Sequence, residues 1–286
     1  MKGEKDDFGQ QAAAPILSGK GYEEPPVFTP ENLLREARRQ KGLEPGLVPE
    51  VCVLDPDGDI VEHLRETGRA KRDPHWACYH TRLYVFEEGG VSYGIVGGVV
   101  GAPFAVLVAE ELFASGCRFL ISVTSAGQIT AVAPPPYFVL IERALRDEGT
   151  SYHYVPPSLY SEPHPELLQM LQGAFEKEKI TVSSGAVWTT DAPFRETATE
   201  IERHRSAGIL AVEMEAAALY AFSRATNNPL VCFAHVTNQM ASIEGDFEKG
   251  AENGSSDALR VIGATAHRWL QRNKHDEATL TRGQER

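Results

Sequence analysis

The segment of residues 209–240 constrains the fold most, because it reads as a complete strand–helix–strand unit. It opens with a short apolar run at residues 209–212, which is typical of a buried strand. An alanine-rich helical run follows at residues 216–224 and stops at Asn227-Asn228-Pro229, since proline does not continue a helix. Residues 230–236 form a second run of strand-forming residues. Such a unit is typical of an open α/β sheet, whose ligands gather beyond the carboxyl ends of the strands.

Polar residues stand at both strand ends of this unit. Glu213 and Glu215 follow the first strand, two residues apart, so in an extended segment their side chains point to the same side. Ionised carboxylates only accept hydrogen bonds and can therefore take both hydroxyl donors of a ribose 2′,3′-diol. Met214 between them offers an apolar face to the sugar ring, and Asn238 follows the second strand. A second interpretation remains open here, in which the glutamates only complement the dipole of the following helix.

The rest of the chain continues the alternation of strands and helices. The expected organisation is one domain over residues 31–272, preceded by a mobile polar extension at residues 1–30 and followed by a polar tail at residues 273–286. Strands are predicted at residues 51–54, 79–86, 93–97, 119–123, 137–141 and 180–187, and helices at residues 30–39, 103–115, 166–178 and 257–272. The strongly charged residues 196–205 are expected to form a solvated helix or a flap.

The composition excludes several classes of function. A net charge of −12 argues against a nucleic-acid or anionic-membrane surface, since either needs a basic face. No apolar run approaches the ~18–20 residues of a membrane-spanning helix, and the polar N-terminus is unlike a signal peptide, so a cytoplasmic location is expected. The four cysteines are scattered, which favours buried free thiols. The nine histidines show no metal-ligand spacing, so neither a metal nor another cofactor is expected.

Three short motifs occur in the same order and at similar spacing as in a known family. They are Ser125-Ala126-Gly127, Thr190-Asp191-Ala192, and Val-Glu-Met-Glu-Ala-Ala-Ala at residues 212–218. From Cys52 to Trp269 the chain resembles the nucleoside phosphorylase family, which includes uridine phosphorylase, the hexameric purine nucleoside phosphorylases and the methylthioadenosine nucleosidases. The resemblance implies an α/β fold of three layers, α/β/α, around a central mixed and partly barrel-like sheet. It also implies a homo-oligomer (a dimer, trimer or hexamer) that shares active sites across an interface.

The resemblance assigns the sugar and the nucleophile to two of these motifs. It implies that Glu213, Met214 and Glu215 contact the ribose, and that Ser125, with Ala126 and Gly127, faces the ribose and the attacking nucleophile. Glu213 and Glu215 then hold the diol and oppose the positive charge that develops on the sugar as the glycosidic bond breaks.

Other residues are assigned to the base and to phosphate. Asp191 and Phe194 belong to the segment that forms the wall of the base pocket in the family, and Asn238 stands where the departing base is contacted. Glycine-rich turns between a strand and a helix can bind anions through their amides. The turn at Gly98 is therefore a candidate phosphate site, together with Arg82 and Ser125. Glu215, Asn238 and Ser125 are the candidate catalytic residues.

The chain departs from the phosphorylases where they bind phosphate. Leu54 and Gly58 stand in the places of a phosphate-binding glycine and arginine, and Ser122 stands in the place of a second arginine. The Ser-Ala-Gly tripeptide is the form that hydrolytic nucleosidases show. Asn238 replaces an aspartate of the purine enzymes, and an amide cannot transfer a proton. The base is therefore expected to leave as a hydrogen-bonded anion, as a 6-oxopurine or uracil can.

The sequence favours an enzyme that splits a uridine or 6-oxopurine nucleoside into the free base and ribose 1-phosphate, with inorganic phosphate as co-substrate. Two alternatives remain open, because a phosphate dianion normally needs cationic partners. One is a phosphate-independent nucleosidase, in which water attacks the sugar. The other is a non-catalytic module that binds nucleosides.

Overall fold

The computed structural model describes residues 14–240 and 244–284, with side chains as far as Lys274. Its strands are β1 (Val51–Asp55), β2 (Ala70–Arg72), β3 (Leu83–Glu88), β4 (Val91–Gly97), β5 (Phe119–Gln128), β6 (Tyr137–Asp147), β7 (Tyr160–Ser161), β8 (Val182–Thr190), β9 (Ile209–Glu213) and β10 (Leu230–Asn238). Within the described residues these form one sheet in the order β10-β6-β8-β9-β5-β1-β4-β3-β2, with β7 beside β6. Because β10 also pairs with β5, the strands β5, β9, β8, β6 and β10 close into a barrel at one end of the sheet.

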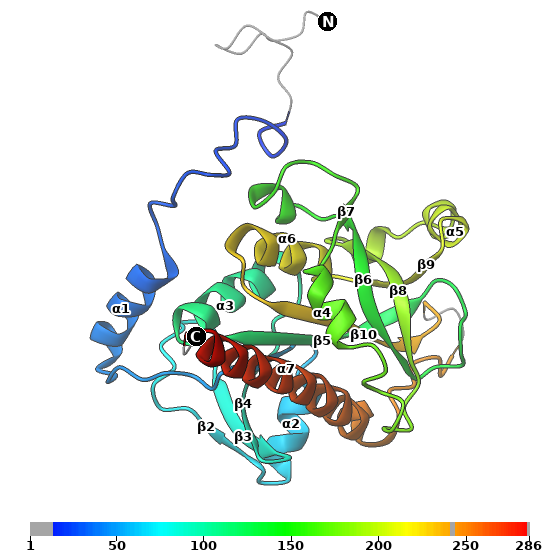
Figure 1. The fold of residues 1–286 in the computed structure, drawn as a ribbon. Coiled ribbons are helices and arrows are strands. Elements are labelled where there is room, and N and C mark those ends of the chain that lie inside the picture. Colours follow the sequence, from blue (N-terminus) through cyan, green and yellow to red (C-terminus); the bar gives the residue numbers. More distant parts are fainter. Residues whose placement is uncertain (1–13, 241–243, 285–286) are drawn as a thin grey trace, which may run out of the picture.

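Helices cover both faces of this sheet (Figure 1). They are α1 (Pro30–Lys41), α2 (Asp59–Glu66), α3 (Ala102–Ala114), α4 (Pro165–Met170), α5 (Ala198–Ser206), α6 (Ala216–Thr226) and α7 (Ser255–Gln284). Buried side chains of α3 and α6 form one core with the sheet, and those of α2, α4 and α7 form another. The strand pairs are both parallel and antiparallel. The predicted three-layer α/β/α fold with a mixed, partly barrel-like sheet is confirmed.

The helix ends follow the local signals of the sequence. The Thr29 hydroxyl accepts a hydrogen bond from the amide of Asn32 (3.3 Å), Pro30 opens α1, and Gly42 ends it with φ of 62°. The chain departs from the predicted pattern elsewhere. The helix α2 was not predicted, and the helix predicted over residues 166–178 ends at Met170 as α4.

The two terminal segments differ in structure. The described part of the predicted extension, residues 14–29, contains turns but no helix or strand, whereas residues 1–13 lie outside the described residues. At the other end α7 continues through the predicted polar tail as far as Gln284. No helix among the described residues is long and apolar enough to cross a membrane. The four cysteines are free and buried, as predicted.

The helix α6 is tied closely to the barrel. Its first three residues, Ala216 to Ala218, are completely buried, because small side chains let the helix approach the sheet. The Tyr220 hydroxyl donates to the carbonyl oxygen of Ile141 in β6 (2.6 Å) and accepts from the amide of Cys232 in β10 (3.1 Å). The junction between β9 and α6 is therefore held against two strands of the barrel.

Four strand ends meet beside this junction. The strands β1, β5 and β10 are parallel neighbours, with Leu54 opposite Ser122 and Cys232 opposite Ser122 on the other side. The antiparallel strand β9 brings Val212 opposite Gly127, and β10 brings Asn238 opposite the same glycine. The polar residues predicted to form a site thus come from adjoining positions at one edge of the sheet.

Candidate active site

Glu213 closes the amino-terminal turn of α6. It is 3% exposed, and its Oε2 accepts from the amides of Glu215 (2.8 Å) and Ala216 (2.7 Å). Its Oε1 accepts from the hydroxyl of Thr189 at the end of β8. Burial raises the pKa of Glu213 to about 7, although these donors favour the charged form. These contacts match the second interpretation of the sequence, in which the glutamate supports the helix.

Glu215 is also buried but accepts fewer hydrogen bonds than Glu213. It is 1% exposed; its Oε1 accepts from the amide of Gly101 (2.6 Å), and its Oε2 accepts from the hydroxyl of Thr124 (2.9 Å). A carboxylate offers about four acceptor positions, two on each oxygen. Glu215 therefore keeps one acceptor position on each oxygen, whereas both positions on Oε2 of Glu213 are taken. Of the two, Glu215 is the better partner for a diol.

Burial and the neighbouring carboxylate together affect the charge of Glu215. Burial, and next the charge of Glu213, raise the pKa of Glu215 to about 8, while the Gly101 amide and the Thr124 hydroxyl oppose the shift. Met214 lies between the two glutamates and is partly exposed. A buried carboxyl group with such a pKa changes charge near neutral pH, which is a property of many catalytic groups.

The ends of β5 and β10 place Asn238 beside the Ser-Ala-Gly motif. The Nδ2 group of Asn238 donates to the Thr237 hydroxyl (3.2 Å) and lies 3.5 Å from the carbonyl oxygen of Ala126, while its Oδ1 accepts from the amide of Met240 (2.9 Å). A Cβ atom on Gly127 would lie 3.4 Å from Oδ1 of Asn238 and 2.5 Å from the sulfur of Met240. A larger residue there would force the Met240 side chain to move and would crowd Asn238.

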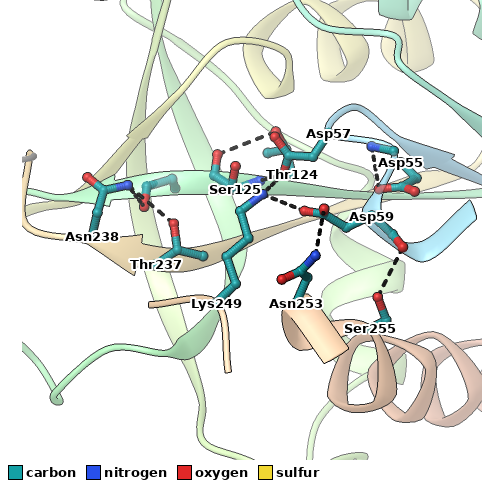
Figure 2. A network of polar contacts seen from close by, with 12 residues as sticks. Asp55, Asp57, Asp59, Thr124, Ser125, Thr237, Asn238, Lys249, Asn253 and Ser255 are labelled. Atoms are coloured by element: carbon teal, nitrogen blue, oxygen red, sulfur yellow. Dashed lines mark hydrogen bonds and ion pairs between the residues drawn. The ribbon is translucent and has the colours of Figure 1, made fainter. Parts of the chain in front are cut away.

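The candidate phosphate residues lie along the same edge with different surroundings. The Gly98 amide already donates to the carbonyl oxygen of Asp55 (3.1 Å). Arg82 is exposed and directly precedes Leu83, which pairs with Val96 near the end of β4. The Ser125 amide donates to Oδ2 of Asp57 (2.9 Å), as Figure 2 shows. All three predicted residues therefore stand at this edge of the sheet, but no arginine lies against Ser125 among the described contacts.

The predicted base-pocket residues lie beyond the end of β8. Asp191 is exposed and its Oδ2 accepts from the amide of Gly149 (2.8 Å). Phe194 lies in the short 3-10 helix η2 (Pro193–Arg195), and its side chain is 99% exposed. The Phe194 side chain therefore lies in solvent in the single chain, and its predicted role requires either a movement of η2 or a second surface against it.

Several residues of the site were not predicted. Thr124 and Gly101 hold Glu215, and Thr189 holds Glu213. Asp57 accepts from the Ser125 amide, and Lys249 lies beside the Asp57 carboxylate. Thr124 stands beside the predicted motif, so its position at a strand end was a usable signal. Lys249 has no such signal, because its segment shows neither strand nor helix periodicity.

Comparison with known proteins assigns the chain to a family. Residues 50–266 match the family described as the Phosphorylase superfamily. The chain is 25% identical over 181 residues to a guanosine phosphorylase of Halorubrum lacusprofundi, covering 63% of this chain and 69% of that protein. It is 26% identical over 177 residues to an uncharacterized protein of Acanthamoeba polyphaga mimivirus, covering 62% of this chain and 66% of the other.

Two solved structures share the fold. A uridine phosphorylase from Vibrio fischeri superposes with a TM-score of 0.61 at 22% identity, covering 79% of this chain and 92% of the other. A purine nucleoside phosphorylase from Toxoplasma gondii, in complex with immucillin-H, gives a TM-score of 0.66 at 17% identity, covering 79% and 93%. At these identities the superpositions establish the fold alone. The family match confirms the resemblance carried by the three motifs: the chain belongs to the Phosphorylase superfamily.

Proposed function

We propose that the protein cleaves the N-glycosidic bond of a 6-oxopurine nucleoside or of uridine by phosphorolysis, releasing the base and ribose 1-phosphate. The observation that carries this proposal is the Glu215 carboxylate, which is buried at the strand ends with one acceptor position left on each oxygen. Membership of the Phosphorylase superfamily supports phosphorolysis, and the guanosine phosphorylase relative supports a 6-oxopurine.

The chemistry follows from where charge develops. As the bond to the base breaks, positive charge grows on the sugar and negative charge on the base. The ionised Glu215 opposes the charge on the sugar and accepts hydrogen bonds from its 2′ and 3′ hydroxyls. The departing base replaces the 3.5 Å contact between Nδ2 of Asn238 and the carbonyl oxygen of Ala126, and the Asn238 amide then donates a hydrogen bond to the base without transferring a proton. The nucleophile approaches from the side of the Ser125 amide.

Asn238→Asp is expected to shift the preference of the enzyme toward 6-aminopurines. A carboxyl group can protonate an adenine that leaves poorly as an anion, and general acid catalysis contributes about 10²–10⁴-fold in rate. The ratio of kcat/KM for adenosine to that for inosine should therefore rise at least about tenfold. Asn32→Asp makes the same change at an exposed position of α1 and should leave the ratio unchanged. An unchanged ratio in Asn238→Asp would remove Asn238 from the base site.

Nucleoside binding is expected to strengthen as the pH rises. Burial and Glu213 raise the pKa of Glu215 to about 8, so below that pH most of Glu215 carries a proton and is a poorer acceptor for the diol. The ionised fraction falls about tenfold per pH unit below a pKa, and affinity should follow it. Calorimetric titration with inosine between pH 6 and pH 9, without phosphate, checks this without interference from phosphate ionisation. A constant affinity would mean that Glu215 does not bind the sugar in its charged form.

A second candidate function is hydrolysis, and one observation favours it. The Ser125 amide faces Asp57 rather than a cationic side chain, so a water molecule is a possible nucleophile there. Incubation of nucleosides with and without inorganic phosphate separates the two reactions. Ribose 1-phosphate as product supports phosphorolysis, and free ribose formed at the same rate without phosphate supports hydrolysis. Nucleoside binding without any turnover would identify a non-catalytic binding module and refute the proposed function.

The proposal extends to the state of the protein in the cell. We infer a cytoplasmic homo-oligomer without a metal or organic cofactor, whose partners are the nucleoside and phosphate. The fully exposed Phe194 ring fits this view, since a neighbouring subunit would cover it. Light scattering on the purified protein, compared with Phe194→Ser, tests whether this ring contributes to an interface.

A further inference from the structure

The Ser125 amide is hydrogen-bonded to a carboxylate of the same chain. Asp57 follows β1 in the turn before α2, and its Oδ2 accepts from the amide of Ser125 on β5 at 2.9 Å (Figure 2). The neighbouring Asp55 has a different role, because its carboxylate accepts from the amides of Gly58 (3.2 Å) and Val61 (2.9 Å) and so supports α2. Asp55 and Asp59 also line the space beside Ser125, but the carboxylate of this turn that accepts from the Ser125 amide is that of Asp57.

Lys249 is the cation beside this carboxylate. Its Nζ lies 3.9 Å from Oδ2 of Asp57 and donates a hydrogen bond to Oδ2 of Asp59. Burial disfavours the charged form, but the hydrogen bond to Asp59 and the charge of Asp57 together raise the pKa of Lys249, so the ammonium group stays charged. The backbone holds this segment in place, since the amide of Glu248 donates to the carbonyl oxygen of Thr237 (2.8 Å).

The space beside Ser125 is almost filled. The cavity at this point measures about 10 Å³, which is room for at most about one water molecule. Asp55, Asp57 and Asp59 line it, whereas no arginine or lysine occurs among the described residues of its lining. Burial lowers the pKa of His235, which also lines it, to about 4, so that its ring is neutral. A phosphate ion therefore does not fit until the Asp57 side chain leaves, and the cation that lies beside the Asp57 carboxylate is Lys249.

We propose that the Asp57 carboxylate occupies the phosphate position and competes with phosphate for the Ser125 amide. When phosphate displaces Asp57 from this amide, it binds Lys249 as its cationic partner. The inference rests on the proposed phosphorolysis and names the phosphate ligands of that site. The Asp57 side chain is 30% exposed, so it has a path into solvent when it is displaced. Because this carboxylate is tethered, it competes at a high effective concentration. The wild-type protein accordingly binds phosphate weakly.

Calorimetric titration with inorganic phosphate at constant ionic strength tests this inference without depending on turnover. Asp57→Asn keeps an oxygen acceptor for the Ser125 amide but removes the charge, and it should tighten phosphate binding about tenfold. Lys249→Gln removes the cation and should weaken phosphate binding about tenfold or more. Glu62→Gln and Lys177→Gln make the same charge changes at exposed positions away from Ser125, and both should bind phosphate within about twofold of the wild type.

The outcomes separate this inference from the proposed function. If Asp57→Asn fails to tighten phosphate binding, or Lys249→Gln binds as the wild type does, the inference is wrong even where phosphorolysis is observed. If both shifts occur and no nucleoside is cleaved, the phosphate site stands and the proposed function fails. If cleavage needs no phosphate and Asp57→Asn abolishes it, Asp57 serves a water nucleophile, and both proposals are overturned.

Discussion

Replacing Glu215 by glutamine is expected to lower kcat/KM for the nucleoside by about 100- to 1,000-fold, the usual loss when one preorganised electrostatic partner of a transition state is removed. Glutamine keeps an oxygen for the Gly101 amide and can donate to the Thr124 hydroxyl, so the local structure should persist. It lacks the negative charge that opposes the cationic sugar, and it offers fewer acceptor positions to the diol. Steady-state kinetics with inosine and saturating phosphate measure the loss.

The same substitution should not destabilise the protein near neutral pH. A carboxyl group whose pKa is raised from its ordinary value of 4.5 to about 8 in the folded chain holds its proton more tightly when folded. The stability it contributes is present below about pH 4.5 and is lost as the pH rises through about 8, by at most ~1.4 kcal/mol per pH unit. The free energy of unfolding of Glu215→Gln in urea, relative to that of the wild type, should therefore increase from pH 5 to pH 8. In the kinetic measurement with inosine, a kcat/KM of Glu215→Gln within about threefold of the wild type would show that Glu215 is not the sugar ligand.

Glu213→Ala is expected to destabilise the protein by about 2–4 kcal/mol, because buried donors left without an acceptor cost about 1–3 kcal/mol each. The substitution leaves the buried amides of Glu215 and Ala216 at the start of α6 without their acceptor, together with the Thr189 hydroxyl. Part of the loss is offset, since burying the Glu213 charge is itself unfavourable. The midpoint and slope of urea unfolding give the free-energy change.

Glu213→Gln is the matched control for this prediction. Its amide oxygen still accepts from the helix amides, so its stability should lie within about 1 kcal/mol of the wild type. Similar stabilities for the alanine and glutamine variants would show that Glu213 does not support α6 and that its contacts with the helix are incidental.

Local signals were sufficient to predict much of the fold. The unit at residues 209–240 appears as β9, α6 and β10, because an apolar run, an alanine-rich run and a proline stop act over a few neighbouring residues. The helix α2 has no such signal, since it begins after Gly58 at φ of 88° without a side-chain cap. The closure of the barrel depends on β10 pairing with both β5 and β6, which is a tertiary property, and the resemblance to the family supplied it.

Part of the site was also predictable from local signals in the sequence. The two-residue spacing of Glu213 and Glu215 indicates a pair of carboxylates, and the family match confirms the family that the three motifs together suggested. Their separate roles depend on partners from three other segments, at Gly101, Thr124 and Thr189, and no spacing in the sequence reveals these contacts.

The approach of Asp57 and Lys249 to Ser125 was equally hidden in the sequence. Asp57 lies in a stretch whose composition indicates only a turn, and Lys249 approaches it from a segment almost two hundred residues later. An ion pair between residues so far apart in the sequence depends on how β1, β5 and β10 are arranged side by side.

A crystal structure of the protein with bound inosine and sulfate in place of phosphate tests the central claim most directly. The account predicts both ribose hydroxyls within hydrogen-bonding distance of Glu215, and the base beside Asn238. A ribose ring bound away from the strand ends that carry Glu215, Ser125 and Asn238 would contradict it.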